Sequence, residues 1–183
     1  EANRLQSGVS TPAVVEDLQE HLIYLDKQIK NIKKAIQDHI NAHSELRQQR
    51  DLLDSIPGIG PLTAAKVLGE IRDICGFDSA RQIAAYAGVT PRNFISGSSV
   101  HKKSRISKTG NANLRKALYM PAISAKKHNP IVRAFCQRLL EAGKQPKEVI
   151  CAAMHKLLHL IFGILKSGKP FDPCFLEKHA LTP

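Results

Sequence analysis

Serine hydroxyls lie among cations in the segment 91–109, and this combination of residue types could cut or bind a phosphodiester. Ser96, Ser98 and Ser99 come first, and a run of basic residues follows them. A serine attacks phosphorus when its pKa is lowered and when nearby positive charge stabilises the transition state. Basic serine-rich loops also occur in proteins that bind DNA without cutting it. Two interpretations stay open here, a nucleophilic serine or a passive phosphate contact.

Positive charge is concentrated around this segment. From Ser79 to Leu140 the chain has twelve basic residues and no acidic one, against a formal net charge of +11 for all 183 residues. Such a surface attracts polyanions, because each neutralised phosphate releases condensed counterions. Nucleic acid is therefore the expected partner; a basic surface kept for solubility or for anionic membranes is the alternative. The cations expected to contact nucleic acid are Arg92, Lys102, Lys103, Arg105, Lys108 and Arg115.

A second candidate contact is the turn at residues 57–60 (sequence PGIG), between two expected helices. Such a turn is typical of the helix-hairpin-helix element of DNA repair proteins, here over about 45–74. Glycine lets the backbone approach closely, and free N–H groups at a helix start bind phosphate. We expect Gly58, Gly60 and Lys66 to contact the DNA backbone. A tight interhelical turn without a ligand is the alternative.

Other chemistries have weaker support. His155 and His159 have a spacing that could bind a metal, but two histidines alone do not make a metal site, and none is expected. The four cysteines are far apart and form no CxxC pair, which favours reduced thiols in an intracellular protein. No apolar run approaches a membrane span. We expect a cytoplasmic, nucleoid-associated protein of a bacterial or archaeal cell, with no membrane partner.

These residues must be positioned by helices, since no stretch shows convincing strand alternation. The expected fold is all-α: a long coiled-coil helix, then a helical domain with a helix-hairpin-helix element and an irregular basic loop. In the segment 11–43, apolar residues recur at alternating spacings of three and four, which is a heptad seam. We expect homo-oligomers through residues 12–42; pairing with another segment, or a long helix docked on its own domain, is the alternative. The seam residues are Val15, Leu18, Leu22, Leu25, Ile29, Ile32 and Ile36.

The helical domain is expected over 44–169, after residues 1–10 as a linker or the end of a preceding domain. Proline and glycine divide it into helices near 44–55, 61–74, 79–88, 111–128, 130–142 and 146–167. The irregular loop, about 91–109, would carry the active site. Thr109, Gly110 and Asn111 are interpreted first as a helix cap. Residues 170–183 are expected to be a tail.

Several of these segments together resemble a known family. They are IPGIGPLTA at 56–64, RQIAAYAGVTP at 81–91, Ser96 with Gly97, SKTGNANLRKALYM at 107–120, KHNP at 127–130 and MHKLL at 154–158. In this order and spacing, over roughly residues 12–173, the chain closely resembles the C-terminal half of insertion-sequence transposases of the one-ten family, especially its eleven-eleven branch.

The resemblance implies a function, and it implies that two domains supply different parts of the active site. Family members carry an N-terminal RuvC-like domain whose four acidic residues bind magnesium, then a coiled coil, then a domain whose serine attacks DNA and forms a phosphoserine link. Some are guided by a bridge RNA. The family's serine precedes a glycine after the GVTP segment, a position that Ser96 holds here; Ser98 and Ser99 are the alternatives. This chain lacks the acidic domain, so magnesium is expected from that domain, and the chain alone should bind nucleic acid but hardly cut it.

The leading hypothesis is therefore the C-terminal domain of a DNA transposase or recombinase, with Ser96 as nucleophile. The alternative is a non-catalytic helix-hairpin-helix DNA-binding module or an inactive transposase remnant. An assembly adaptor held together by the coiled coil is a third possibility, but it explains the basic loop poorly.

Overall fold

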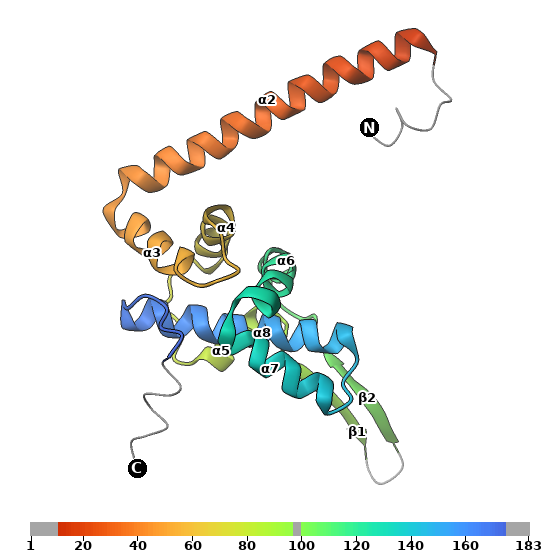
Figure 1. Cartoon of the computed structure of the whole chain (residues 1–183), viewed down its shortest axis with the longest axis vertical. Coiled ribbons are helices and arrows are strands. Elements are labelled where there is room, and N and C mark those ends of the chain that lie inside the picture. Colours follow the sequence, from red (N-terminus) through yellow and green to blue (C-terminus); the bar gives the residue numbers. More distant parts are fainter. Residues whose placement is uncertain (1–10, 97–99, 175–183) are drawn as a thin grey trace. The chain divides into compact units, whose positions relative to one another are not determined.

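The computed structural model describes residues 11–96 and 100–174, and it describes 93–96 and 100–104 by their backbone alone. The expectations for residues 1–10, for Ser98 and Ser99, and for the end of the tail from 175 lie outside the described residues. The chain divides into two compact units, Glu1–Ser44 and Glu45–Pro183. The described part is mainly helical, as the sequence predicts (Figure 1).

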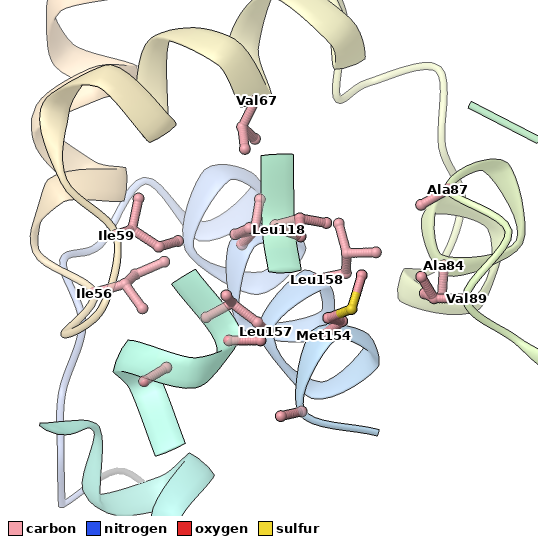
Figure 2. Packing of buried hydrophobic residues seen from close by; sticks show 14 of the residues in the cluster. Ile56, Ile59, Val67, Ala84, Ala87, Val89, Leu118, Met154, Leu157 and Leu158 are labelled. Carbon is pink, nitrogen blue, oxygen red and sulfur yellow. The ribbon is translucent and has the colours of Figure 1, made fainter. Parts of the chain in front are cut away.

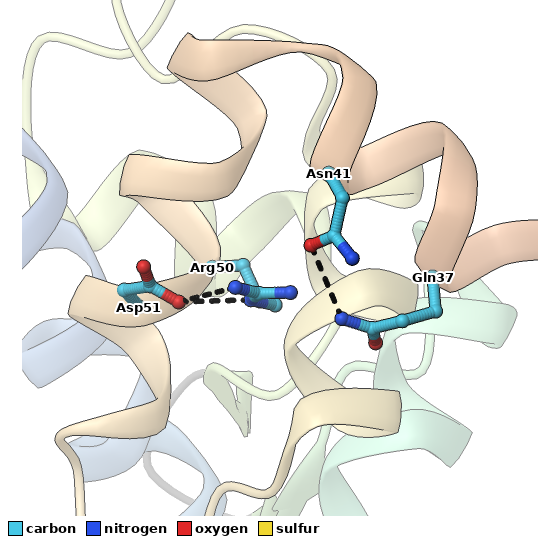
Figure 3. Close-up of polar contacts among 4 residues, drawn as sticks. All are labelled: Gln37, Asn41, Arg50 and Asp51. Carbon is cyan, nitrogen blue, oxygen red and sulfur yellow. Dashed lines mark hydrogen bonds and ion pairs between the residues drawn. The ribbon is translucent and has the colours of Figure 1, made fainter.

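The first unit is built on helix α2 (Pro12–Ala42), which begins as expected with Thr11 as N-cap and a proline in its first turn. A helix of 31 residues is about 46 Å long. Within it the Gln37 amide donates to Asn41 Oδ1 one turn later, at 3.3 Å (Figure 3). Ile29 and Ile32 of the predicted seam are 48% and 58% exposed. The coiled-coil partner of this seam stays a prediction.

The second unit contains six helices and one hairpin in its described part. They are α3 (Ser44–Asp54), α4 (Pro61–Ile71), α5 (Ala80–Tyr86), β1 (Pro91–Ser96), β2 (Val100–Ile106), α6 (Ala112–His128), α7 (Pro130–Glu141) and α8 (Pro146–Ser167). In α3, the Arg50 guanidinium donates to Asp51 Oδ1, with Nη2 at 2.6 Å (Figure 3). The Asp51 side chain is 57% exposed and the Arg50 side chain is 13% exposed. An ion pair with one partner in solvent contributes little to stability.

Helix α8 is the centre of the second unit, because α5, α6 and α7 all pack against it. Met154, Leu157 and Leu158 of α8 are buried against Leu118 of α6 in one hydrophobic cluster, which extends to the α3–α4 turn and to α5 (Figure 2). By length and composition α8 could also cross a membrane. This is weak evidence for a membrane span, because apolar residues of α8 form the core of the second unit.

The segment 91–109 is not irregular throughout, and this part of the prediction is wrong. Strands β1 and β2 form a two-stranded antiparallel sheet, with a bulge between Arg92 and Phe94. The sequence hides these strands because they pair with each other locally and need no apolar face against a core. The sheet is small, and the all-α class stands.

The turn between α3 and α4 is held against α6. Ile56 and Ile59 are buried, as predicted, and Gly58 has a φ of +105°. A Cβ on Gly58 would lie 2.7 Å from the backbone of Ala125 in α6. Helix α4 packs mainly on α6 and makes little direct contact with α3. Packing thus accounts for the glycine at 58, and the helix-hairpin-helix interpretation stays a prediction.

We expect Gly58→Ala to destabilise the fold by about 2 kcal/mol or more, because it combines an unfavourable φ with a clash against α6. Gly60→Ser is the matched control: Gly60 caps α4 with a φ of −101°, no atom lies within 4 Å of an added Cβ, and serine is a good N-cap. Denaturant unfolding measures both variants. Equal stability of Gly58→Ala and wild type would contradict this packing account.

A second prediction concerns Asn129, which is fully buried and caps α7 by accepting from the N–H groups of Ile131 and Val132 at 3.1 and 3.2 Å. Asn129→Ala should lower the free energy of unfolding by about 1–2 kcal/mol, because the two N–H groups lose their acceptor. Asn129→Ser keeps an acceptor and should lose less. The same loss in both variants would show that the cap is not the cause.

Candidate nucleic-acid interface

The β1–β2 hairpin carries five of the basic or serine residues predicted to act on DNA. The register places Arg92 opposite Arg105 and Ser96 opposite Val100, so that Ser96 ends the described part of β1. Both arginines are exposed. Like charges directly opposite each other in a sheet repel. A phosphate held between them would remove that repulsion, which makes the pair suited to a polyanion. The five residues are Arg92, Ser96, Lys102, Lys103 and Arg105.

The base of the hairpin is fixed to the helical unit by backbone hydrogen bonds. Ser107 N–H donates to Thr90 O at 2.9 Å, Lys108 N–H to Gly88 O at 3.0 Å, and Asn111 N–H to Tyr86 O at 2.6 Å. The chain can approach this closely because Gly88 has no side chain: a Cβ there would lie 2.6 Å from Thr109 O. The hairpin therefore leaves the domain from a defined base.

Asn111 joins three helices at that base. Its side-chain Oδ1 accepts from Leu114 N–H at 2.9 Å, which confirms the predicted cap of α6. Its Nδ2 donates to Glu70 Oε2 of α4 at 2.8 Å and to the hydroxyl of Tyr86 at 3.1 Å. The Tyr86 hydroxyl donates to the Glu70 carbonyl at 3.2 Å. Sequence reasoning found the cap but missed Glu70, because 41 residues separate the two partners.

Arg115, predicted to contact nucleic acid, is half-buried and donates through Nη1 to the Ala87 carbonyl at 2.9 Å. It therefore ties α6 to the end of α5. A guanidinium has five N–H donors, so this bond leaves others for a phosphate. Lys108 is exposed beside it, with a φ of +56°. Neither residue has been tested as a DNA contact, and both remain predictions.

Lys66 belongs to α4 and not to the hairpin. It lines an open cleft of about 530 Å³ between α4 and α6. The cleft also contains Lys116 of α6, one of the basic residues between 79 and 140 to which no specific role was assigned. Gly60, the other glycine of the turn, is exposed at the start of α4 and has no side-chain cap there. The predicted contacts thus lie in three places: on the hairpin, at Lys108 and Arg115 near its base, and along the α3–α4 turn and α4.

His155 and His159 stack on α8 with ring centroids 4.5 Å apart. Burial lowers the pKa of both rings, and the charges of His155, Lys156 and Arg81 lower the pKa of His159 further. The described part of the chain brings together no group of three or more His, Cys, Asp or Glu side chains suited to a metal ion. The four cysteines are free thiols.

Comparison with known proteins identifies the family. Residues 50–137, from α3 to α7, match the model of the transposase IS116/IS110/IS902 family. The pilin gene-inverting protein of Moraxella bovis is 38% identical over 157 residues, which are 81% of this chain and 49% of that protein.

Two further relatives are more distant. The transposase for insertion sequence element IS1328 of Yersinia enterocolitica is 29% identical over 168 residues, 85% of this chain and 46% of that protein. The insertion element IS110 uncharacterized 43.6 kDa protein of Streptomyces coelicolor is 28% identical over 140 residues, 76% of this chain and 34% of that protein. The chain spans about half the length, or less, of these relatives. The resemblance drawn from the sequence motifs is confirmed: residues 50–137 form a transposase domain of the IS116/IS110/IS902 family.

Proposed function

We propose that this chain is the DNA-rearranging domain of a transposase or recombinase, which binds DNA through the β1–β2 hairpin and supplies Ser96 as the nucleophile. Family membership and the names of the relatives, a gene-inverting protein and a transposase, support the reaction class. The observation that carries the proposal is the pairing of Arg92 with Arg105 on a hairpin without a carboxylate. Two arginines opposite each other concentrate positive charge on the hairpin, and guanidinium groups bind phosphodiesters through charge-assisted hydrogen bonds.

In the proposed reaction, each phosphoester bond that breaks is replaced by a new one. The Ser96 oxygen forms a bond to phosphorus while the bond from phosphorus to one neighbouring nucleotide breaks, and the leaving oxygen takes up a proton. Attack by another strand's hydroxyl on the phosphoserine reverses the step and joins the strands in a new order. Because one phosphodiester bond is replaced by another, no external energy source is required. Cations at the hairpin stabilise the charge that develops on phosphorus oxygens.

This domain would act with partners. We propose that magnesium is held by the RuvC-like domain that the family resemblance implies. We also propose that α2 pairs with a second copy of itself, because its seam residues Ile29, Ile32 and Ile36 are exposed along one face. Holding several strands during an exchange requires such an assembly. A bridge RNA, if one is used, would bind to the basic surface formed by residues between 79 and 140.

A second candidate function is a non-catalytic DNA-binding module. The exposed start of α4 supports it, because Gly60 leaves the first N–H groups of the helix without a side-chain cap, and such groups bind phosphate. This module would bind DNA with a steep salt dependence and would be unaffected by the loss of Ser96.

We expect Arg92→Ala/Arg105→Ala to weaken DNA binding and to make the slope of log K against log salt about two units shallower, because two phosphate contacts are lost. The control Lys144→Ala/Lys147→Ala removes the same charge from two exposed positions, one in the loop before α8 and one in the first turn of α8. Fluorescence anisotropy at several salt concentrations measures both. The hairpin is not the interface if the two double variants have equal slopes.

Ser96→Ala should abolish covalent protein–DNA adducts in a protein that carries this chain together with the family's RuvC-like domain, while leaving DNA affinity nearly unchanged. Denaturing gel electrophoresis of labelled DNA detects the adduct. Ser98→Ala and Ser99→Ala are the matched controls and should retain it. Persistence of the adduct in Ser96→Ala would refute the assignment, and its loss in a control would move the nucleophile to that serine.

A further inference from the structure

An open cleft lies between α4 and α6 and carries a lysine on each wall. The two helices pack side by side (Figure 1), and the cleft of about 530 Å³ lies open between them. This volume is within the range of small-molecule and cofactor sites in proteins. Each helix contributes one lysine and one small residue. The lining residues are Lys66, Gly69 and Glu70 of α4 and Asn113, Lys116 and Ala117 of α6.

The charges of the cleft favour an anion. Lys66 and Lys116 are exposed on opposite walls, and neither forms an ion pair with another described residue. Glu70 is the one acidic residue of the lining, and its Oε2 is occupied by the Asn111 amide. Asn113 lies in the first turn of α6, where the partial positive charge of the helix dipole adds to that of the lysines.

The surface beside the cleft is partly apolar. Met120 and Ile123 of α6 are 67% and 38% exposed, and they lie between Lys116 and Lys127 at helical spacings of three and four. These four residues form one stripe along the outside of α6. A ligand that is anionic at regular intervals and apolar between them would match it. A nucleic-acid strand has this character, since phosphates alternate with sugars and bases, and Met and Ile are known to contact base steps.

We propose that the α4–α6 cleft is a second nucleic-acid site, which holds the sugar-phosphate backbone of a strand between Lys66 and Lys116 and contacts its sugars and bases through Met120 and Ile123. The inference rests on the proposed function, because it assumes that the chain binds nucleic acid. The two proposals concern different surfaces. The strand that is cut binds at the hairpin, and the inference adds a second strand at the α4–α6 cleft. Two sites on one domain would hold two strands at once, as strand exchange requires.

Gly69 provides a test that keeps the fold intact. It lies exposed in the last turn of α4, and an added Cβ would meet no atom within 4 Å. Gly69→Gln should therefore stabilise the helix while its side chain enters the cleft. Gly163→Gln is the matched control, because Gly163 is an equally exposed and open position in α8 that does not line the cleft. Unfolding cannot then explain a loss of binding.

The experiment measures affinities for single-stranded DNA, single-stranded RNA and duplex DNA of one sequence, in wild type and in Arg92→Ala/Arg105→Ala. With the hairpin arginines removed, residual binding should remain, and adding Gly69→Gln should weaken it about tenfold or more, whereas adding Gly163→Gln should not change it. Lys66→Ala/Lys116→Ala should make the salt slope about two units shallower. The nucleic acid whose affinity falls most in these variants is the one that the cleft binds.

Two results would overturn the inference, and they are distinguishable. If wild type binds but Gly69→Gln binds every strand as tightly as Gly163→Gln does, the cleft is not a site and the proposed function stands. If wild type binds none of the nucleic acids, the proposed function fails and the inference fails with it.

Discussion

The hydrogen bonds of Asn111 are the interaction on which the arrangement of the candidate site depends. One side chain caps α6, bonds Glu70 of α4 and bonds the Tyr86 hydroxyl of α5, while its backbone N–H holds the chain that returns from the hairpin. Each bond is modest in free energy. Together they fix the orientation of three helices at the base of the hairpin. Gly110 is required beside it, because a Cβ there would lie 2.3 Å from the Tyr86 carbonyl.

The core and the basic surface are separated within the same short stretch of chain. Helix α6 illustrates this division, because Leu114, Leu118 and Ala122 are fully buried while Lys116 and Met120 on its opposite side are exposed. Burial of the first face against α8 contributes stability without using any cation. The exposed face can therefore carry charge that would be costly to bury. One face of α6 thus stabilises the fold, and the opposite face carries positive charge that can bind a polyanion.

Much of the fold could be predicted from local signals. Proline marks the start of α2, α7 and α8, because its fixed φ suits the first turn, and glycine follows the ends of α7 and α8. Pro121, which lies inside α6, shows that proline alone does not always end a helix. The hairpin was missed, since its strands satisfy their hydrogen bonds with each other and show no apolar alternation. For Gly58 the sequence supported a phosphate contact, but its close approach to Ala125 shows a packing requirement that no local pattern could reveal.

By itself, the sequence determined the family, the helical class and the concentration of positive charge between residues 79 and 140, because these depend on residue types and their order along the chain. Tertiary structure decided which of these residues meet. It placed Arg92 opposite Arg105, Lys66 across a cleft from Lys116, and Glu70 on Asn111. Such pairs join residues 13 to 50 positions apart. Their contact is set by how helices and strands pack, which spacing along the chain does not encode.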